Sequence, residues 1–179
     1  MPMLLRLRWL TLLAACLASF AATAQSVQLK VFDKVGDEVG PFDHGLVYVR
    51  LDEATIVAVR LGPLTVESPR GQWSDVTRMV PVAGPSDVYF SEPNCMGTAY
   101  LSSYTLDVPG VQPMGASVDK RGRATLYIGK ARRPVVRDLQ SLLYKYGGGC
   151  RNRKSQVSVI PVTSTFDLAA RFPVPYTLR

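Results

Sequence analysis

Residues 87–103 read DVYFSEPNCMGTAYLSS, and this stretch decides the fold. Two runs of alternating apolar residues, 88–90 and 99–101, flank a polar turn that contains Cys95. Alternation with a period of two is typical of half-buried strands. The stretch therefore predicts two strands that meet at a cysteine, whose one available partner is Cys150 in the sequence YGGGCRNRK. We interpret the pair as the covalent clamp of a small exported β-domain.

The N-terminus has the pattern of a signal peptide. Arg6 and Arg8 precede a charge-free apolar run, residues 9–20, and residues 22–24 (ATA) give the small-x-small pattern of a cleavage site. The apolar run is shorter than the roughly 20 residues that a transmembrane helix needs. We therefore expect a signal peptide over residues 1–24 and export to the periplasm or the medium, with no transmembrane segment in the mature chain.

A lipoprotein signal is the alternative interpretation of the same segment. Residues 13–16 (LAAC) resemble a lipobox, in which Cys16 would become a lipid-bearing N-terminus. The apolar run before Cys16 is very short, however, and the residues after it stay apolar instead of forming a polar tether. Soluble export is therefore the favoured interpretation, and a lipid anchor through Cys16 is the less favoured one.

Removal of the signal leaves residues 25–179, about 155 residues, a length that suits a single domain. Cys95 and Cys150 are then the two cysteines of the folded part, and two cysteines in an exported chain usually form a disulfide. Their separation of 55 positions corresponds to a stabilisation of about 4 kcal/mol. With one histidine and no further cysteine there is no ligand set for zinc, and we expect no metal and no cofactor.

Short runs rich in β-branched residues recur between turns and predict an all-β fold. The clearest hairpin joins residues 46–51 to residues 55–61, and a second joins residues 116–118 to residues 124–128. Short antiparallel strands at this spacing indicate a β-sandwich or a barrel-like fold. Further strands are expected at residues 27–31, 157–162 and 163–172, and a turn region is expected at 33–43. Proline and glycine recur between residues 62 and 85, so we expect only short strands there, such as 77–82.

Residues 135–146 (VVRDLQSLLYKY) fit two structures equally well. Their apolar positions have helical spacing, Pro134 precedes them, and Gly147 follows them, which is the usual order at the two ends of a helix. A run that leads directly into Cys150 also suits a strand of the sheet. The sequence therefore leaves two alternatives open for residues 135–146, one short helix or one more strand.

Three features in order carry a resemblance to other proteins. An aromatic strand enters a cysteine turn in residues 89–100 (YFSEPNCMGTAY), a Leu-Tyr strand follows at residues 126–128, and a second cysteine comes after a glycine turn at residues 149–150. This order resembles a loose group of short, exported bacterial β-proteins of unknown function with one disulfide, over most of residues 27–178. The resemblance implies the β-fold and the disulfide, and it assigns no catalytic residue.

Charge is distributed unevenly along the chain. Residues 119–154 hold eleven lysines and arginines against two aspartates, a net charge of +9, whereas residues 25–118 hold six basic against eleven acidic side chains, a net charge of −5. Basic clusters concentrate anionic partners, and Tyr127, Tyr144 and Tyr146 interleave with these charges. The candidate binding residues are Lys120, Arg121, Arg123, Lys130, Arg132, Arg133, Arg151, Arg153 and Lys154.

Other candidate sites have simpler interpretations. The acidic residues Asp33, Asp37, Glu38 and Asp43 lack the ordered spacing of a calcium loop and suit a charged turn. A Ser-His-Asp triad would have to use His44, and no serine lies in a nucleophile-elbow pattern. Residues 117–120 match S-x-x-K, the acylation motif of penicillin-binding enzymes, but they lie in an expected β-turn, and the companion motifs are missing.

The sequence thus favours an exported, non-enzymatic β-domain that binds partners on a basic surface. An anionic glycan, lipopolysaccharide or a lipid surface is the expected kind of partner, because an exported protein meets these more readily than nucleic acid. The alternative is a structural or accessory subunit of a cell-surface assembly, in which residues 172–179 would dock on a neighbour as an extended segment. A hydrolase that uses His44 is the more distant alternative.

Overall fold

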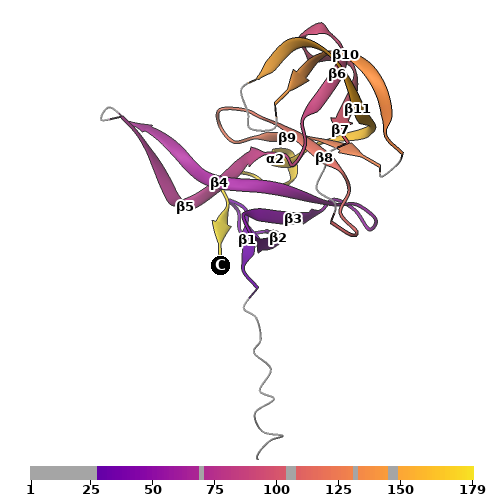
Figure 1. The fold of residues 1–179 in the computed structure, drawn as a ribbon. Helices are drawn as coiled ribbons and strands as arrows, with labels where there is room; N and C mark the ends of the chain where they lie inside the picture. Colours follow the sequence, from indigo (N-terminus) through magenta and orange to yellow (C-terminus); the bar gives the residue numbers. More distant parts are fainter. Residues whose placement is uncertain (1–27, 69–70, 104–107, 131–132, 145–148) are drawn as a thin grey trace, which may run out of the picture.

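Six strands form the first sheet, in the order β12-β1-β2-β3-β4-β5 (Figure 1). All its pairings are antiparallel, and its strands are β1 (Lys30–Phe32), β2 (Glu38–Asp43), β3 (Leu46–Arg50), β4 (Ile56–Ser68), β5 (Gly71–Ala83) and β12 (Thr177–Leu178). The structure, a computed structural model, describes residues 28–68, 71–103, 108–130, 133–144 and 149–179. The expected signal peptide, residues 1–24 with Cys16, lies outside the described residues.

The second sheet has the order β10-β6-β7-β11-β9-β8. Strand β10 also pairs with β11, so that β6, β7, β11 and β10 close into a ring and the sheet is nearly barrel-shaped. Its strands are β6 (Val88–Glu92), β7 (Met96–Ser102), β8 (Met114–Val118), β9 (Ala124–Gly129), β10 (Val135–Leu143) and β11 (Cys150–Asp167). The expected all-β fold of antiparallel strands is therefore confirmed.

The two best sequence signals for hairpins are confirmed as well. Strands β3 and β4 pair from Leu46 opposite Arg60 to Arg50 opposite Ile56, and β8 pairs with β9 over the predicted residues. In β3, Val47 and Val49 are fully buried and alternate with more exposed neighbours. Strand β9 alternates in the same way, whereas Val57, Ala58 and Val59 of β4 are all fully buried, so β4 is covered on both faces.

Two clusters of buried side chains fill the fold. The larger lies between the first sheet, the β8–β9 hairpin and the short helix α2 (Leu168–Arg171). The smaller lies in the ring and is built on Val88, Phe90 and Leu101, with the Tyr127 ring edge-on to Phe90 at 5.9 Å between centroids. Strand β9 separates the clusters, because Leu126 belongs to the larger and the adjacent Tyr127 packs on the smaller.

The expectation of only short strands between residues 62 and 85 is wrong. Strands β4 and β5 each run for 13 residues and form a long hairpin that projects from the rest of the molecule (Figure 1). Their ladder has irregularities next to Leu61, which lies opposite Pro81, and next to Pro63, which lies opposite Met79. A proline lacks an N–H donor but is tolerated at a bulge, so the prolines here shift the register without ending the strands.

Residues 135–143 form strand β10, and the alternative of a helix at 135–146 is wrong. Strand β10 pairs with β11 on one side and, through its last three residues, with β6 on the other. Leu139, Ser141 and Leu143 follow the period of two that a strand requires, and Leu142 on the opposite face is also buried. This additional buried leucine produced the helix-like spacing in the sequence, whereas Tyr146 lies outside the described residues.

The bounds of four smaller segments also differ from expectation. Residues 38–43 of the expected turn region form β2, and the expected strand at 27–31 is β1, Lys30–Phe32, with Val27 outside the described residues. The expected strand at 157–162 is the centre of β11. The expected strand at 163–172 is β11 only as far as Asp167, whose carboxylate caps α2 by accepting the N–H groups of Ala169 and Ala170.

The C-terminal residues 172–179 pack on their own chain and are not a free arm. Strand β12 pairs with β1, and Lys30 and Arg179 exchange two backbone hydrogen bonds of 2.9 and 3.0 Å. Tyr176 is fully buried, and its backbone exchanges two hydrogen bonds with Met79 of β5. These residues are therefore paired within their own chain and do not form the free extended segment that the sequence suggested.

Truncation of Tyr176 should reveal how much this packing stabilises the fold. We expect Tyr176→Ala to lower the free energy of unfolding by about 3–5 kcal/mol, because it empties the space of a fully buried ring. The control Tyr176→Phe removes only the hydroxyl that donates to the Phe172 carbonyl, and should cost about 1 kcal/mol. Urea denaturation measures both, and equal losses would contradict the packing role of the ring.

Candidate binding face

The predicted disulfide between Cys95 and Cys150 is present, with 5.8 Å between the two Cα atoms. Cys95 ends the short 3₁₀ turn η1 (Pro93–Cys95), which joins β6 to β7, and Cys150 is the first residue of β11. The bond therefore attaches the turn at the end of the ring to the beginning of its longest strand. Two cysteines far apart in the sequence meet because β6, β10 and β11 are neighbours in the ring.

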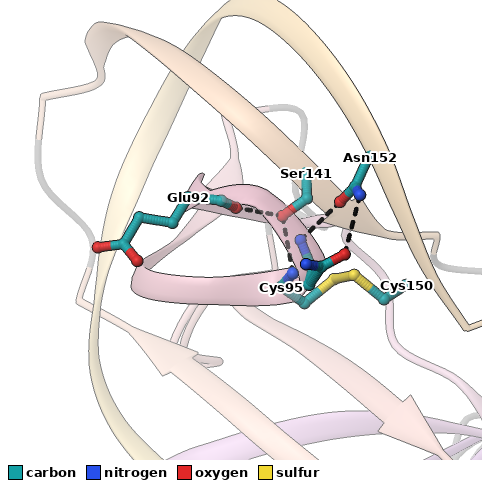
Figure 2. Close-up of a disulfide and its surroundings, with 6 residues drawn as sticks. Glu92, Cys95, Ser141, Cys150 and Asn152 are labelled. Atoms are coloured by element: carbon teal, nitrogen blue, oxygen red, sulfur yellow. Dashed lines mark hydrogen bonds between the residues drawn. A yellow bond between two sulfur atoms is a disulfide. The ribbon is translucent and has the colours of Figure 1, made fainter.

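Hydrogen bonds hold the turn on both sides of the disulfide (Figure 2). Asn94 and Cys95 both have left-handed backbones, with φ of 58°, which is unusual for residues other than glycine. The side chain of Asn152 accepts the N–H of Asn94 and donates to its side-chain oxygen. The Cys95 N–H donates to the Ser141 hydroxyl, which donates in turn to the Glu92 carbonyl. The fully buried Ser141 thus helps to fix the turn.

Exposed cations follow the disulfide directly. Arg151, Arg153 and Lys154 lie in the first five residues of β11, and all three are exposed. In the ladder with β10, Leu139 lies opposite Ser155 and Ser141 opposite Asn152. Two residues of β11, Arg153 and Lys154, therefore oppose the single residue Gln140. This is the pattern of a β-bulge, which bends a strand and redirects its side chains.

Tyrosines lie beside these cations. Tyr89 of β6, Leu142 of β10 and Arg151 of β11 are successive partners in one row across three strands, so their side chains share a face. The Arg151 guanidinium lies 5.9 Å from the centre of the Tyr144 ring, close enough for a cation–π contact. Burial raises the pKa of the Tyr89 phenol, Asp87 adds to the rise, and the nearby Arg153 opposes it.

We call this surface the cationic barrel face, and it consists of Tyr89, Gln140, Tyr144, Arg151, Arg153 and Lys154. Of the predicted binding residues it contains only Arg151, Arg153 and Lys154. Tyr89 and Gln140 were not predicted as site residues, because Tyr89 reads as a core aromatic of a strand and Gln140 as an ordinary polar position. Their place depends on the pairing of three strands, which no local pattern reveals.

The predicted residues Lys120, Arg121 and Arg123 lie elsewhere, in the turn between β8 and β9. This turn is beside the last residue of β11, since Asp167 pairs with Thr125, whereas the cationic barrel face is beside the first. The Asp119 carboxylate accepts the backbone N–H groups of Arg121 and Arg123 and pairs with the Arg123 side chain at 2.8 Å. The charge of this group is therefore partly neutralised within the turn.

The remaining predicted cations lie between these two groups. Lys130 follows the end of β9, and Arg133 precedes β10; both are exposed, and both are near the middle of β11, since Gly129 pairs with Val162. Arg132 lies outside the described residues, as does Tyr146. Tyr127 packs in the small core and does not join the basic side chains. The single basic surface expected from the sequence is thus divided into groups along the length of β11.

The acidic turn and the histidine form local hydrogen bonds. The Asp33 carboxylate accepts the N–H groups of Val35, Gly36 and Asp37, so it closes the turn between β1 and β2. No cluster of three metal-ligating side chains occurs in the described ranges. His44 is exposed, and the hydrogen bond of its Nδ1 to Asp43, at 2.6 Å, raises the pKa of the imidazole.

The S-x-x-K match is accidental, because its serine lies on a strand. Ser117 belongs to β8 and Lys120 to the turn that follows, whereas the acylation motif requires the start of a buried helix.

A hollow of about 670 Å³ lies on the first sheet and not at the cationic barrel face. Both of its arginines have partners within the protein: Arg50 donates to the Glu53 carbonyl, and Arg171 donates to the Leu51 carbonyl. The Ala54 and Thr55 groups that bond to Asp52 lower the pKa of its carboxyl, and nearby Arg171 lowers it further. These contacts stabilise the connection between β3 and β4, and they leave the hollow with mixed, internally paired charge.

No family model matches the chain, and neither a curated protein nor a solved structure is significantly similar to it. The resemblance to short exported bacterial β-proteins therefore stays a prediction. In the part of the chain that the structure describes, no helix is long and apolar enough to cross a bilayer.

Loss of the disulfide should destabilise the protein strongly. We expect the double variant Cys95→Ser, Cys150→Ser to lose about 4 kcal/mol of unfolding free energy, because the bond closes a loop of 55 positions in the unfolded chain. Urea denaturation under non-reducing conditions measures this loss, and reduced wild-type protein is the matched control. A loss below about 1 kcal/mol would show that the hydrogen bonds of Ser141 and Asn152 hold the turn without the disulfide.

Proposed function

We propose that the protein is exported and binds anionic envelope or extracellular partners on the cationic barrel face. The observation that carries this proposal is the run of exposed cations that begins directly after Cys150. Arg151, Arg153 and Lys154 lie on a strand that the disulfide and the Asn94–Asn152 hydrogen bonds attach to its neighbours. Cations held in place lose less conformational entropy on binding than cations on a loose loop.

Export is supported by the cysteine chemistry and by the N-terminal sequence. Disulfides persist in oxidising compartments such as the periplasm and the medium. The sequence of residues 1–24 has the pattern of a signal peptide. In those compartments acidic polysaccharide, lipopolysaccharide and anionic lipid headgroups are the abundant polyanions, so a cationic face there meets them first. The proposed role is binding, and it assigns no catalytic step to the chain.

Neutralising the cationic barrel face should weaken binding and reduce its salt dependence. The test variant is Arg151→Gln, Arg153→Gln, Lys154→Gln, measured against lipopolysaccharide, anionic vesicles, acidic glycans and DNA across a salt series. Each cation that contacts the polyanion releases counterions, so we expect the slope of log affinity against log salt to fall by about one unit per cation removed.

The matched control removes three exposed cations from other parts of the surface. The variant Lys120→Gln, Arg121→Gln, Lys130→Gln changes the net charge equally and leaves the cationic barrel face intact. We expect it to retain most of the affinity. If both triple variants weaken binding equally, the charge acts only through its total, and the face is not a binding site.

A second function, as a subunit of a cell-surface assembly, is favoured by the projecting β4–β5 hairpin (Figure 1). From Leu64 opposite Asp75 to Ser68 opposite Gly71, the two strands pair with each other beyond the end of β3. Strand edges of this kind are templates for pairing with another chain.

Removal of the hairpin tests this second function. Pro63 lies opposite Met79, so replacing residues 64–78 by Asn-Gly joins them through a two-residue turn. If the hairpin assembles the protein, the wild type should show a mass above that of a monomer by light scattering at high concentration, and the shortened variant should not. A wild type that stays monomeric throughout would exclude self-assembly through this hairpin.

A further inference from the structure

A shallow hollow of about 460 Å³ lies at the β-bulge of the β10–β11 ladder. It is lined by Asp138, Leu139, Gln140, Lys154, Ser155 and Gln156. Gln140 and Lys154 belong to the cationic barrel face, so the hollow continues that face along the same two strands. Its volume falls within the range of small-molecule sites, roughly 300–1,000 Å³, but it is open to solvent.

The polar groups of the hollow combine donors with acceptors. The Gln156 amide donates to the Asp138 carboxylate at 3.2 Å, and these two residues are direct partners in the ladder. Gln140 adds an amide with both a donor and an acceptor, and Lys154 adds an ammonium group that only donates. A surface that bound phosphate alone would need donors only, so the acceptors here require another explanation.

Hydroxyl groups provide that explanation, because each hydroxyl both donates and accepts hydrogen bonds. The carboxylate of Asp138 repels phosphate and other bare anions, but it accepts hydrogen bonds from hydroxyls. Arg153 and Arg151 continue the charge on the same strand, over about 16 Å from residue 151 to residue 156. The Tyr144 ring, 41% exposed, adds apolar surface beside Arg151. A ligand that matches the whole face carries hydroxyls at one end and negative charge at the other.

We propose that the hollow is the hydroxyl-binding part of a site for an acidic glycan, a polymer of hydroxyl-rich sugars with carboxylate or sulfate groups. Asp138, Gln140 and Gln156 bind the hydroxyls, and Lys154, Arg153 and Arg151 bind the acidic groups. An open hollow on an extended strand suits a chain that lies across the surface. This inference rests on the proposed function and names the ligand class of the same face.

Four probes separate this ligand class from its competitors: polygalacturonate and chondroitin sulfate as acidic glycans, polyphosphate as a polyanion without hydroxyls, and phosphatidylglycerol vesicles as a lipid surface. The test variant is Gln140→Ala, Gln156→Ala in the oxidised protein. We expect it to bind the acidic glycans about tenfold more weakly, as the loss of two hydrogen bonds predicts, and to bind polyphosphate as the wild type does. The control Gln28→Ala, Gln112→Ala removes two glutamines outside the hollow and should change neither affinity.

A second variant should change the affinities for glycan and for polyphosphate in opposite directions. Asp138→Asn removes the carboxylate but keeps its size, so it should weaken glycan binding while strengthening polyphosphate binding. Equal behaviour of glycan and polyphosphate across all variants would overturn the inference, as would selective binding to the vesicles. If the Arg151, Arg153, Lys154 variant loses glycan binding but the glutamine variant keeps it, the proposed function stands and this inference fails. If the wild type binds neither these four probes nor lipopolysaccharide, both fail.

Discussion

Strand β11 is the element on which the rest of the structure depends, because it forms hydrogen-bonded ladders with three other strands. Its first part pairs with β10, its centre with β7 and its last part with β9. The first two ladders close the ring around the small core, and the third holds the β8–β9 hairpin against the first sheet. One continuous backbone thus connects both cores, and the disulfide at Cys150 anchors the end that carries the cations.

The sequence predicted those parts of the fold in which neighbouring residues determine the structure. Short runs rich in β-branched residues, separated by short turns, located two hairpins in residues 46–61 and 116–128, and the number of cysteines located the disulfide. It failed where distant segments determine the structure. Leu142 is buried on the outer face of β10, so the spacing of the leucines suggested a helix. Pro63 and Pro81 suggested broken strands, because the register shifts that accommodate these prolines depend on the pairing of β4 with β5.

The candidate site shows the same division between local and distant information. The sequence identified Arg151, Arg153 and Lys154 by their charge, but it grouped them with Lys120 and Arg121 because all are close in the chain. In the fold these groups lie beside opposite ends of β11. Tyr89 and Gln140 reach the cations only through pairing between β6, β10 and β11, and the hollow lies where a bulge interrupts that ladder.

The pairing of β1 with β12 has a consequence for the order of events during synthesis. Residues 30–32 leave the ribosome early, whereas their partners in residues 177–179 are made after almost every other residue described. The first sheet therefore keeps one open edge until residues 177–179 have been made, and Tyr176 cannot fill its place in the core before then. Closing so long a loop is entropically costly and slow. Completion of the sheet thus comes late in folding, and the open edge must be protected from edge-to-edge pairing until then.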